Sequence, residues 1–505
     1  MQTSATPRFR FDNSYARDLP GFYVPCKPAQ VPAPRLLFLN TALAAELGLD
    51  PAALQSDAGA AVLAGNTEPE GAEPLAQAYA GHQFGGFSPQ LGDGRALLLG
   101  EVVDRQGRRR DIAFKGSGRT PFSRGGDGKA AVGPMLREVL IGEAMHALGV
   151  PTTRALAVAA TGEPVVRETM LPGAVLTRVA ASHLRVGTFQ FYAARGEDDK
   201  LRQLLDYAIA RHDPDLVGSD DRCLALLGRV AQRQAALIAQ WMNFGFIHGV
   251  MNTDNMTISG ETIDYGPCAF IEGYDPQAVF SSIDHNGRYA YGNQPPIAQW
   301  NIARLAEALL PLMAPRDDRQ AAAEAVAKAS EVVQGFPGLY QAALLRGQRE
   351  KLGLADTGEA GEATDRALAN DWLGLLQAQG VDFTLAWRRL AGAAAGDDSP
   401  LKALFQEQQA LQEWLARWRA RCETDSASSA EGRAASMRRV NPWIIPRNHR
   451  VEEALAAASQ GDDLAPFGQL LSALRNPYQE TTENASYAES APAAVTACYQ
   501  TFCGT

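Results

Sequence analysis

The chain has 505 residues, of which 46% are apolar and 21% charged, a balance typical of folded proteins and not of disordered ones. Its 47 basic and 57 acidic residues give a net charge of −10, which argues against nucleic acid as a partner, since polyanion binding needs a basic surface. No run approaches the ~20 apolar residues of a membrane span, and the first residues lack a secretory signal. We therefore expect a cytoplasmic protein without a membrane partner. The six sparse cysteines fit a reducing compartment.

The N-terminal part of the chain contains the strand patterns. Residues 1–80 form an N-terminal extension, in which a proline-rich segment precedes a short helix at 40–47. Residues 81–190 alternate strand patterns with turn residues, which predicts a strand-containing lobe with nucleotide-binding loops. In chain order we expect strands at 96–103 and 111–115, a glycine-rich loop at 116–133, a helix at 134–148, and strands at 154–159, 164–168 and 174–179.

The chain changes character after about residue 190. Apolar residues at helical spacing and many Ala and Leu residues predict a large helical lobe over 191–480, with helices such as 223–243, 298–312 and 403–421. Residues 425–433 predict an exposed loop. The polar tail, 481–505, is expected to be poorly ordered and carries Cys503. Strands followed by helices favour an α+β fold, here a protein-kinase-like two-lobed fold.

The most informative run is HGVMNTDN at 248–255, which is followed by IDYG at 263–266. Protein kinases use H-R-D-x-x-x-x-N and then D-F-G, in which the Asn and the second Asp hold magnesium. The spacing from His248 to Asn255 is the same, and Asp264 stands at the D-F-G aspartate. The pattern predicts a metal site made by Asn255 and Asp264, because hard cations prefer oxygen ligands. A hydrogen-bonded turn rich in Asn and Asp is the alternative.

One position of this motif lacks the kinase residue. The kinase base would be the third residue of the run, and here it is Val250, which cannot accept a proton. A carboxylate does occur at Asp254, directly before the Asn. Phosphoryl transfer to a hydroxyl is therefore in doubt, whereas the residues needed to bind a metal and a nucleotide are present.

A lysine ends one predicted strand and needs an acidic partner. Lys115 follows Ile-Ala-Phe, and a lysine at a strand end can reach the phosphates of a nucleotide. The next helix offers Glu138 and Glu143. The helical pattern does not choose between them, and we select Glu138 because a partner should leave the helix on the cleft side. Alone, such a lysine is usually solvated.

Glycines and arginines gather before and after this strand pair. The turn Gly92-Asp-Gly94-Arg95 allows close approach of the backbone to phosphate or sugar oxygens, although a simple tight turn is the alternative. The loop 116–129 joins a strand to a helix N-terminus and mixes glycines with basic residues, which suits a polyphosphate or, alternatively, a surface linker. Arg178 and Arg185 suit phosphate oxygens, but alone they would be interpreted as surface charges.

Five runs together resemble the selenoprotein O family of pseudokinase-fold protein adenylyltransferases. They are QAYAGHQFGG at 77–86, QLGDGR at 90–95, KGSGRTPFSR at 115–124, HGVMNTDN at 248–255 and IDYGP at 263–267. The resemblance extends from about residue 11 through 300, and weakly to the C-terminus. Runs this long and unusual are specific.

The resemblance implies a reaction. Members of the family bind ATP end for end relative to a kinase, with the γ-phosphate buried. AMP is then transferred to Ser, Thr or Tyr hydroxyls of protein substrates, and diphosphate leaves. ATP would be the co-substrate with Mg²⁺ or Mn²⁺, and we expect a monomer. An ordinary protein kinase and a non-catalytic ATP-binding pseudokinase scaffold remain the alternatives.

The resemblance also assigns roles by matching positions. Asp254 would be the catalytic proton acceptor, and Asn255 and Asp264 the metal ligands. Arg178 and Arg185 would hold the buried γ-phosphate. The remaining residues of the ATP site, together with the lysine partner chosen above, would be Gly92, Gly94, Arg95, Lys115, Asp127, Gly128, Asp264 and Glu138.

Two cysteines suggest a regulatory link. Members with selenocysteine carry it near the C-terminus, where this chain has Cys503, and Cys268 lies four residues after Asp264. We hypothesise that the tail brings Cys503 to Cys268 and that a disulfide gates the cleft. Two unrelated thiols are the alternative.

Overall fold

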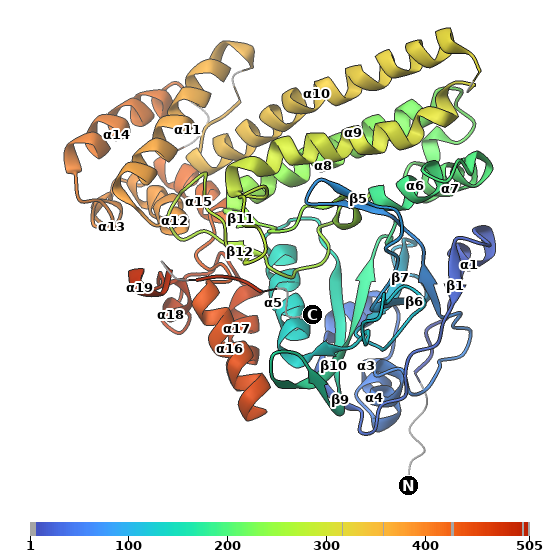
Figure 1. The fold of residues 1–505 in the computed structure, drawn as a ribbon. Coiled ribbons are helices and arrows are strands. Elements are labelled where there is room, and N and C mark those ends of the chain that lie inside the picture. Colours follow the sequence, from blue (N-terminus) through green and yellow to red (C-terminus); the bar gives the residue numbers. More distant parts are fainter. Residues whose placement is uncertain (1–6, 316, 357, 426–428, 497–498, 503–505) are drawn as a thin grey trace.

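The fold combines helices with an antiparallel sheet. The computed structural model describes residues 7–315, 317–356, 358–425, 429–496 and 499–502. Among these residues the main sheet has eight strands, with helices on both of its faces (Figure 1). The strand order is β1 (Tyr23–Pro25), β3 (Leu75–Gln77), β6 (Ala96–Val103), β7 (Arg109–Lys115), β10 (Met170–Ala180), β9 (Arg154–Val166) and β2 (Arg35–Leu39), and β8 (Ala130–Ala131) pairs with β10.

The hairpin of β6 and β7 forms the centre of this sheet. Its residues are apolar on both faces, because helices cover both sides. Leu97 and Leu99 pack into a cluster with the N-terminal helices, whereas Leu98 points into the larger core on the opposite face. The helices of that cluster are α2 (Thr41–Glu46), α3 (Pro51–Leu54) and α4 (Asp57–Leu63), whereas α1 (Ser14–Asp18) packs into the larger core. The strand predicted at 96–103 is confirmed.

Helix α5 (Val132–Ala147) covers the other face of the sheet. It begins without a side-chain cap, directly after β8, and its C-terminal turn is followed by Gly149 at φ +82°, a conformation that favours glycine. Most of its residues are buried, because α16 (Asn448–Gly461) and α17 (Ala465–Leu474) pack against it from the outside. The helix predicted at 134–148 is therefore present and starts two residues earlier.

The second half of the described chain is mainly helical. Helices α8 (Arg222–Phe244), α9 (Gln294–Met313) and α10 (Arg319–Leu352) pack side by side (Figure 1). The described residues contain no helix that is long and apolar enough to cross a membrane. The other helices are α6 (Val186–Ala193), α7 (Asp198–His212), α11 (Glu359–Gln379), α12 (Phe383–Ala394), α13 (Ser399–Lys402), α14 (Gln408–Glu423), α15 (Ala430–Val440), α18 (Ala485–Ala488) and α19 (Ala493–Thr496).

Short elements between α8 and α9 carry the motif residues. They are β11 (Phe246–Ile247), the 3₁₀ turn η2 (Thr253–Asn255), β12 (Ala269–Phe270) and the 3₁₀ turn η3 (Tyr291–Asn293). The turn η1 (Pro214–Leu216) precedes α8. A separate hairpin of β4 (Gly81–Gln83) and β5 (Gly86–Ser88) contacts η2.

Three predictions about the bounds of strands and helices were wrong. The strands expected at 154–159 and 164–168 are one strand, β9, because β10 pairs with it on both sides of the gap between the two expected strands. A register shift between Pro172 and Ala174 of β10, a β-bulge, accommodates the residues in that gap. The helix expected at 403–421 is broken at 403–407, where the amide oxygen of Gln379 accepts the backbone N–H groups of Gln406 and Glu407. Within the loop expected at 425–433, α15 already begins at Ala430.

The described residues near both ends of the chain are more structured than the sequence indicates. Residues of the N-terminal 80 contribute β1, β2 and β3 to the main sheet. The tail was expected to be poorly ordered, and for its described residues this is wrong. Thr501 is buried, and its backbone N–H donates to the carbonyl oxygen of Phe280 at 2.7 Å. Both segments gain order from distant partners, which local composition does not reveal.

Candidate active site

One cleft brings together all the predicted site residues. It has a volume of about 1060 Å³ and is bounded by β6, β7, α5, the loop 116–129 and the segment 250–267. Residues that lie far apart in the sequence therefore face one space. The predicted residues that line it are Gly92, Gly94, Arg95, Lys115, Asp127, Gly128, Glu138, Arg178, Arg185, Asp254, Asn255 and Asp264.

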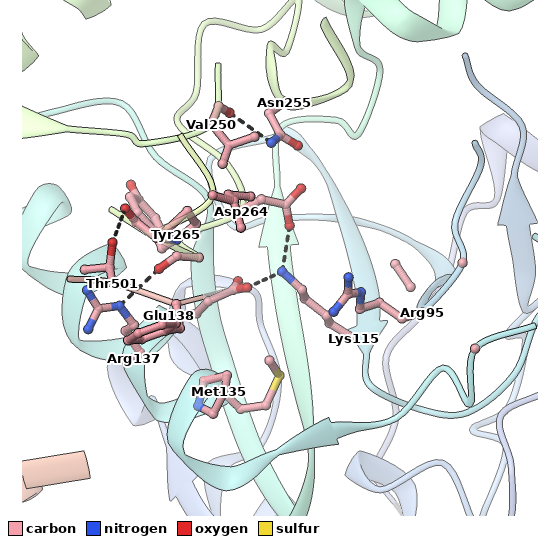
Figure 2. A pocket seen from close by; sticks show the side chains of 18 of the residues that line it. Arg95, Lys115, Met135, Arg137, Glu138, Val250, Asn255, Asp264, Tyr265 and Thr501 are labelled. Atoms are coloured by element: carbon pink, nitrogen blue, oxygen red, sulfur yellow. Dashed lines mark hydrogen bonds and ion pairs between the residues drawn. The ribbon is translucent and has the colours of Figure 1, made fainter. Parts of the chain in front are cut away.

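Lys115 lies at the centre of a charge cluster in this cleft. Its ammonium group, at the end of β7, contacts the carboxylate of Glu138 and lies 2.8 Å from Oδ1 of Asp264 (Figure 2). Glu143, the other candidate partner on α5, instead pairs with Arg154 at 2.6 Å. The sequence-based choice of Glu138 as the partner of the lysine is therefore confirmed.

Asp264 is surrounded by cations. Arg178 Nη1 donates to its Oδ1 at 2.7 Å, and Arg185 Nη1 lies 3.5 Å from its Oδ2. Burial alone would raise the pKa of Asp264, but Lys115 and the two arginines hold that pKa well below its usual range. The residue also has φ +61°, a strained backbone conformation for a non-glycine residue. The carboxylate is thus ionised and fixed.

A second layer of residues, which the sequence analysis missed, holds the two arginines. Arg178 Nε donates to Nε2 of His183 at 3.2 Å, and Nδ1 of His183 bonds the carboxylate of Asp111 at 2.8 Å. Burial lowers the pKa of His183, so the ring is neutral and can accept the bond from the arginine. Arg185 faces Asp93 at 3.8 Å. The position of His183 between Arg178 and Arg185 in the sequence was the one pattern that could have indicated this supporting role.

The segment 248–255 is tied to the residues before Asp264. Nε2 of His248 lies 2.8 Å from the carbonyl oxygen of Ile263, and Nδ1 accepts the backbone N–H of Val250 at 3.3 Å. Both bonds fit one neutral tautomer, with the proton on Nε2. His248 therefore holds the two halves of the motif together and does not face a substrate.

Asn255 and Asp264 offer two oxygen ligands to a cation. The amide nitrogen of Asn255 donates to the carbonyl oxygen of Val250 at 3.0 Å, which turns its Oδ1 away from that loop (Figure 2). An amide oxygen and an ionised carboxylate are the donors that Mg²⁺ and Mn²⁺ prefer. The chemistry of the pair therefore fits a divalent cation.

Asp254 is a buried carboxylate with one free oxygen. Its Oδ2 accepts a hydrogen bond from Nε2 of Gln83 at 3.1 Å, whereas its buried Oδ1 has no hydrogen-bond partner among the described residues. Burial raises the pKa of Asp254 to about 6. Val250 lines the same cleft, but a valine cannot accept a proton. Asp254 is thus suited to accept one, and sequence reasoning gave Gln83 no role.

The glycine positions leave no room for side chains. A Cβ on Gly92, which has φ +73°, would lie 2.3 Å from the ring of Phe122, and one on Gly94 would lie 2.9 Å from the carbonyl oxygen of Phe122. A Cβ on Gly128, at φ +67°, would lie 2.0 Å from the carbonyl oxygen of Gly118. Gly92 and Gly94 thus let the turn 92–95 pack against Phe122 of the loop 116–129, and Gly128 lets that loop pack on itself, so that together they shape the wall of the cleft.

Asp127 lies on the more exposed side of the cleft. Its side chain is 41% exposed and pairs with Arg167 at 2.9 Å, and its Oδ1 also accepts the backbone N–H of Lys129 at 3.0 Å. The main contacts of this carboxylate therefore stabilise the conformation of the loop.

The C-terminal segment supplies a wall of the cleft that sequence reasoning missed. The described tail residues 499–502 all line it. The hydroxyl of Tyr499 donates to Glu452 at 2.9 Å, and the hydroxyl of Thr501 donates to the carbonyl oxygen of Pro267 at 2.8 Å (Figure 2). The tail thus contacts the segment that follows Asp264. No local pattern in the tail indicated this.

The predicted link between two cysteines stays a prediction. Cys268 is buried, and burial raises the pKa of its thiol to about 11. Cys503 lies outside the described residues.

Comparisons with known proteins agree with one another. The family described as "Protein adenylyltransferase SelO" matches residues 7–475. A protein nucleotidyltransferase YdiU of Cereibacter sphaeroides (strain KD131) is 61% identical over 498 residues, which cover 98% of this chain and all of the relative. The protein of the same name from Chromobacterium violaceum is 61% identical over 489 residues, 96% of this chain and all of the relative. That of Methylorubrum extorquens is 57% identical over 508 residues, 99% of this chain and all of the relative.

Proposed function

The chain belongs to the SelO family of protein adenylyltransferases, and we propose that it transfers AMP from ATP to Ser, Thr or Tyr hydroxyls of proteins. Its activity as a protein nucleotidyltransferase follows from the family and from relatives that match over their full length. The ATP co-substrate, the hydroxyl acceptors and the roles of individual residues are our proposal. The acceptor oxygen bonds to the α-phosphorus, the bond from that phosphorus to the bridging oxygen breaks, and diphosphate leaves.

The observation that carries this proposal is the pair Val250 and Asp254. The position of the kinase base holds a valine. Four residues later, a buried carboxylate lines the cleft, and one of its oxygens has no hydrogen-bond partner in the described part of the chain. Asp254 accepts the proton of the attacking hydroxyl. Because its pKa of about 6 lies close to neutral pH, it is mostly ionised and still a useful base.

The cations of the cleft bind the triphosphate. Arg178 and Arg185 hold the γ-phosphate, which is the inner end of a nucleotide bound end for end relative to a kinase. Lys115 contacts the phosphates from β7, and Glu138 keeps its ammonium group in place. Fixed cations near the leaving diphosphate lower the barrier, since they stabilise the charge that develops on it.

Asn255 and Asp264 would hold Mg²⁺ or Mn²⁺, and the other predicted residues complete the nucleotide site. Such an ion, when bound, neutralises phosphate charge and orients the phosphate oxygens. The turn at Gly92, Gly94 and Arg95 faces the nucleotide. Asp127 and Gly128 shape the loop that lies over it.

We extend the proposal to the organisation of the chain. The sheet with α5 corresponds to the N-terminal lobe of a kinase-like fold, and the helical part to its C-terminal lobe, with boundaries at about residues 80, 190 and 480. We propose a monomer that acts in the cytoplasm on protein substrates. The charge of −10 supports the prediction that nucleic acid is not a partner.

The transferred group can be identified directly. Purified protein is incubated with a cell lysate, MgCl₂ or MnCl₂, and ATP labelled with ³²P at either the α- or the γ-phosphate. We expect protein-bound label from α-labelled ATP only, and mass spectrometry should show AMP on hydroxyl side chains. Label from γ-labelled ATP would identify a kinase, and no label from either would identify a non-catalytic ATP-binding protein. Asp254→Asn should lower the rate of transfer by about 10²- to 10⁴-fold, the usual effect of losing a general base.

A further inference from the structure

The hairpin of β4 and β5 lies apart from the main sheet and is anchored on the turn that carries Asp254. The backbone N–H of His82 donates to Oγ1 of Thr253 at 2.7 Å, and the backbone N–H of Phe84 donates to Oδ1 of Asn252 at 3.1 Å. Two backbone groups on either side of Gln83 are thus bonded to the two residues that precede Asp254. The position of Gln83 relative to Asp254 is fixed by main-chain bonds.

Helix α6 holds this contact from a third direction. Oε1 of Gln190 accepts the hydroxyl of Thr253 at 2.6 Å, and Nε2 of Gln190 bonds Nδ1 of His82 at 2.8 Å. Gln190 and Thr253 are buried, and His82 is partly buried. A closed set of hydrogen bonds therefore joins the hairpin, the turn η2 and α6, and it leaves Gln83 little freedom to move relative to Asp254.

The hairpin contacts both oxygens of the Asp254 carboxylate. Nε2 of Gln83 donates to Oδ2 at 3.1 Å. The other oxygen, Oδ1, faces Gly81, where a Cβ would lie only 2.6 Å away, and it is buried without a hydrogen-bond partner among the described residues. One oxygen is therefore held by the hydrogen bond from Gln83, and the other packs against the backbone of the hairpin at Gly81.

Without the hydrogen bond from Gln83, no hydrogen bond from the hairpin would hold the carboxylate in one orientation. The terminal torsion of an aspartate has a broad, roughly two-fold preference, so the carboxylate can turn easily. We propose that Gln83 is a positioning residue, whose hydrogen bond to Oδ2 fixes the orientation in which the Asp254 carboxylate accepts the proton of the acceptor hydroxyl. This inference rests on the proposed role of Asp254 as proton acceptor.

The test compares variants at Gln83 with a matched control in the same hairpin. Gln83→Ala removes the donor, and Gln83→Glu keeps the shape but places a second carboxylate against Asp254. Ser88→Ala is the control, since that side chain is partly exposed and does not line the cleft. The assay follows transfer of label from α-labelled ATP to a fixed amount of lysate protein over a range of ATP concentrations. Calorimetry with ATP and Mg²⁺ measures nucleotide binding separately.

We expect Gln83→Ala to lower the maximal rate about 10- to 100-fold, the usual effect of losing a hydrogen bond to a charged group. Gln83→Glu should lower it at least as much, while the KM and Kd for ATP stay unchanged in both variants. Ser88→Ala should keep the parent rate. A higher KM for ATP with an unchanged maximal rate would overturn the positioning role.

A double-variant cycle separates positioning from a structural effect. In an Asp254→Asn background, Gln83→Ala should cause no further loss, because there is no carboxylate left to orient. If Gln83→Ala lowers the rate by the same factor in both backgrounds, the inference is overturned. It is also overturned if the parent transfers AMP and the Asp254→Asn variant keeps full activity. A parent that transfers no label from α-labelled ATP would instead contradict the proposed function, so the two failures are distinguishable.

Discussion

Replacing Asp264 by Asn tests whether the cations of the cleft are held together by a single carboxylate. Asp264 lies 2.8 Å from the ammonium group of Lys115 and 2.7 Å from the guanidinium of Arg178, and Arg185 lies 3.5 Å away. The asparagine keeps the volume and removes the charge. Glu138 then remains the nearby acid that faces Lys115 and Arg178, at 3.9 Å from the latter.

The structure indicates two separate consequences. Removing one partner of a buried ion pair costs ~3–5 kcal/mol, because the remaining charge stays buried, so the nucleotide-free variant should be less stable by that order. A triphosphate supplies the missing negative charge, so ATP should stabilise the variant more than the parent. Because one metal ligand is lost, ATP binding by the variant should no longer depend on Mg²⁺, and transfer of AMP should cease.

Two measurements check this reasoning. Denaturant unfolding followed by tryptophan fluorescence, with and without ATP, gives the change in stability. Calorimetric titration with ATP, in Mg²⁺ or in EDTA, gives the dependence on metal. A variant as stable as the parent, whose affinity for ATP still rises with Mg²⁺, would refute both the charge argument and the metal assignment.

Three further substitutions have defined outcomes. Gly92→Ala should weaken ATP binding at least tenfold in calorimetry, because its Cβ would lie 2.3 Å from the ring of Phe122 at φ +73°; unchanged affinity would contradict the packing of this wall. His183→Ala removes the acceptor that orients Arg178 and should raise the KM for ATP about tenfold, whereas an unchanged KM would exclude this support role. Burial lowers the pKa of Lys351 to about 7, below its value of 10.5 in an unfolded chain, so the unfolded state binds the extra proton between these pH values and stability rises with pH. Lys351→Met should therefore stabilise the fold by up to ~4 kcal/mol at pH 7 but only by ~1 kcal/mol at pH 10, where the gain is largely lost. Aromatic rings around the ammonium group offset part of this gain, and equal stabilisation at both pH values in urea unfolding would contradict the pKa shift.

Local sequence patterns predicted the helices and strands that are long enough to show a periodic pattern. The strand at 96–103 and the helix α5 follow from apolar runs and from turn residues at their ends. The strands β1 and β3 have three residues each, too few for a periodic pattern, and they exist because neighbouring strands pair with them. Whether such short strands form depends on the neighbouring strands that pair with them, and not on their own composition.

The same distinction holds for the site. The spacing of the motif residues was enough to place Asp254, Asn255 and Asp264 on adjacent loops. The choice between Glu138 and Glu143 needed a geometric guess, since both are buried on α5. Glu143 is occupied elsewhere because Arg154 and Arg475 pair with it.

The supporting residues could not be predicted in this way. Gln83 precedes Asp254 by 171 residues, and the hydrogen bond between them depends on how a separate hairpin docks onto η2. Asp111 precedes His183 by 72 residues and reaches it through the sheet. A local pattern along one sequence carries no information about such contacts.

The wall formed by residues 499–502 has a consequence for biosynthesis. These are the last residues of the cleft to leave the ribosome, after the sheet, α5 and the segment around Asp264 have already been made. A nascent chain can therefore fold most of the nucleotide site while the side next to Pro267 is still open. Because Thr501 follows Pro267 by 234 residues, this side of the nucleotide site closes only after almost all of the described chain has been made.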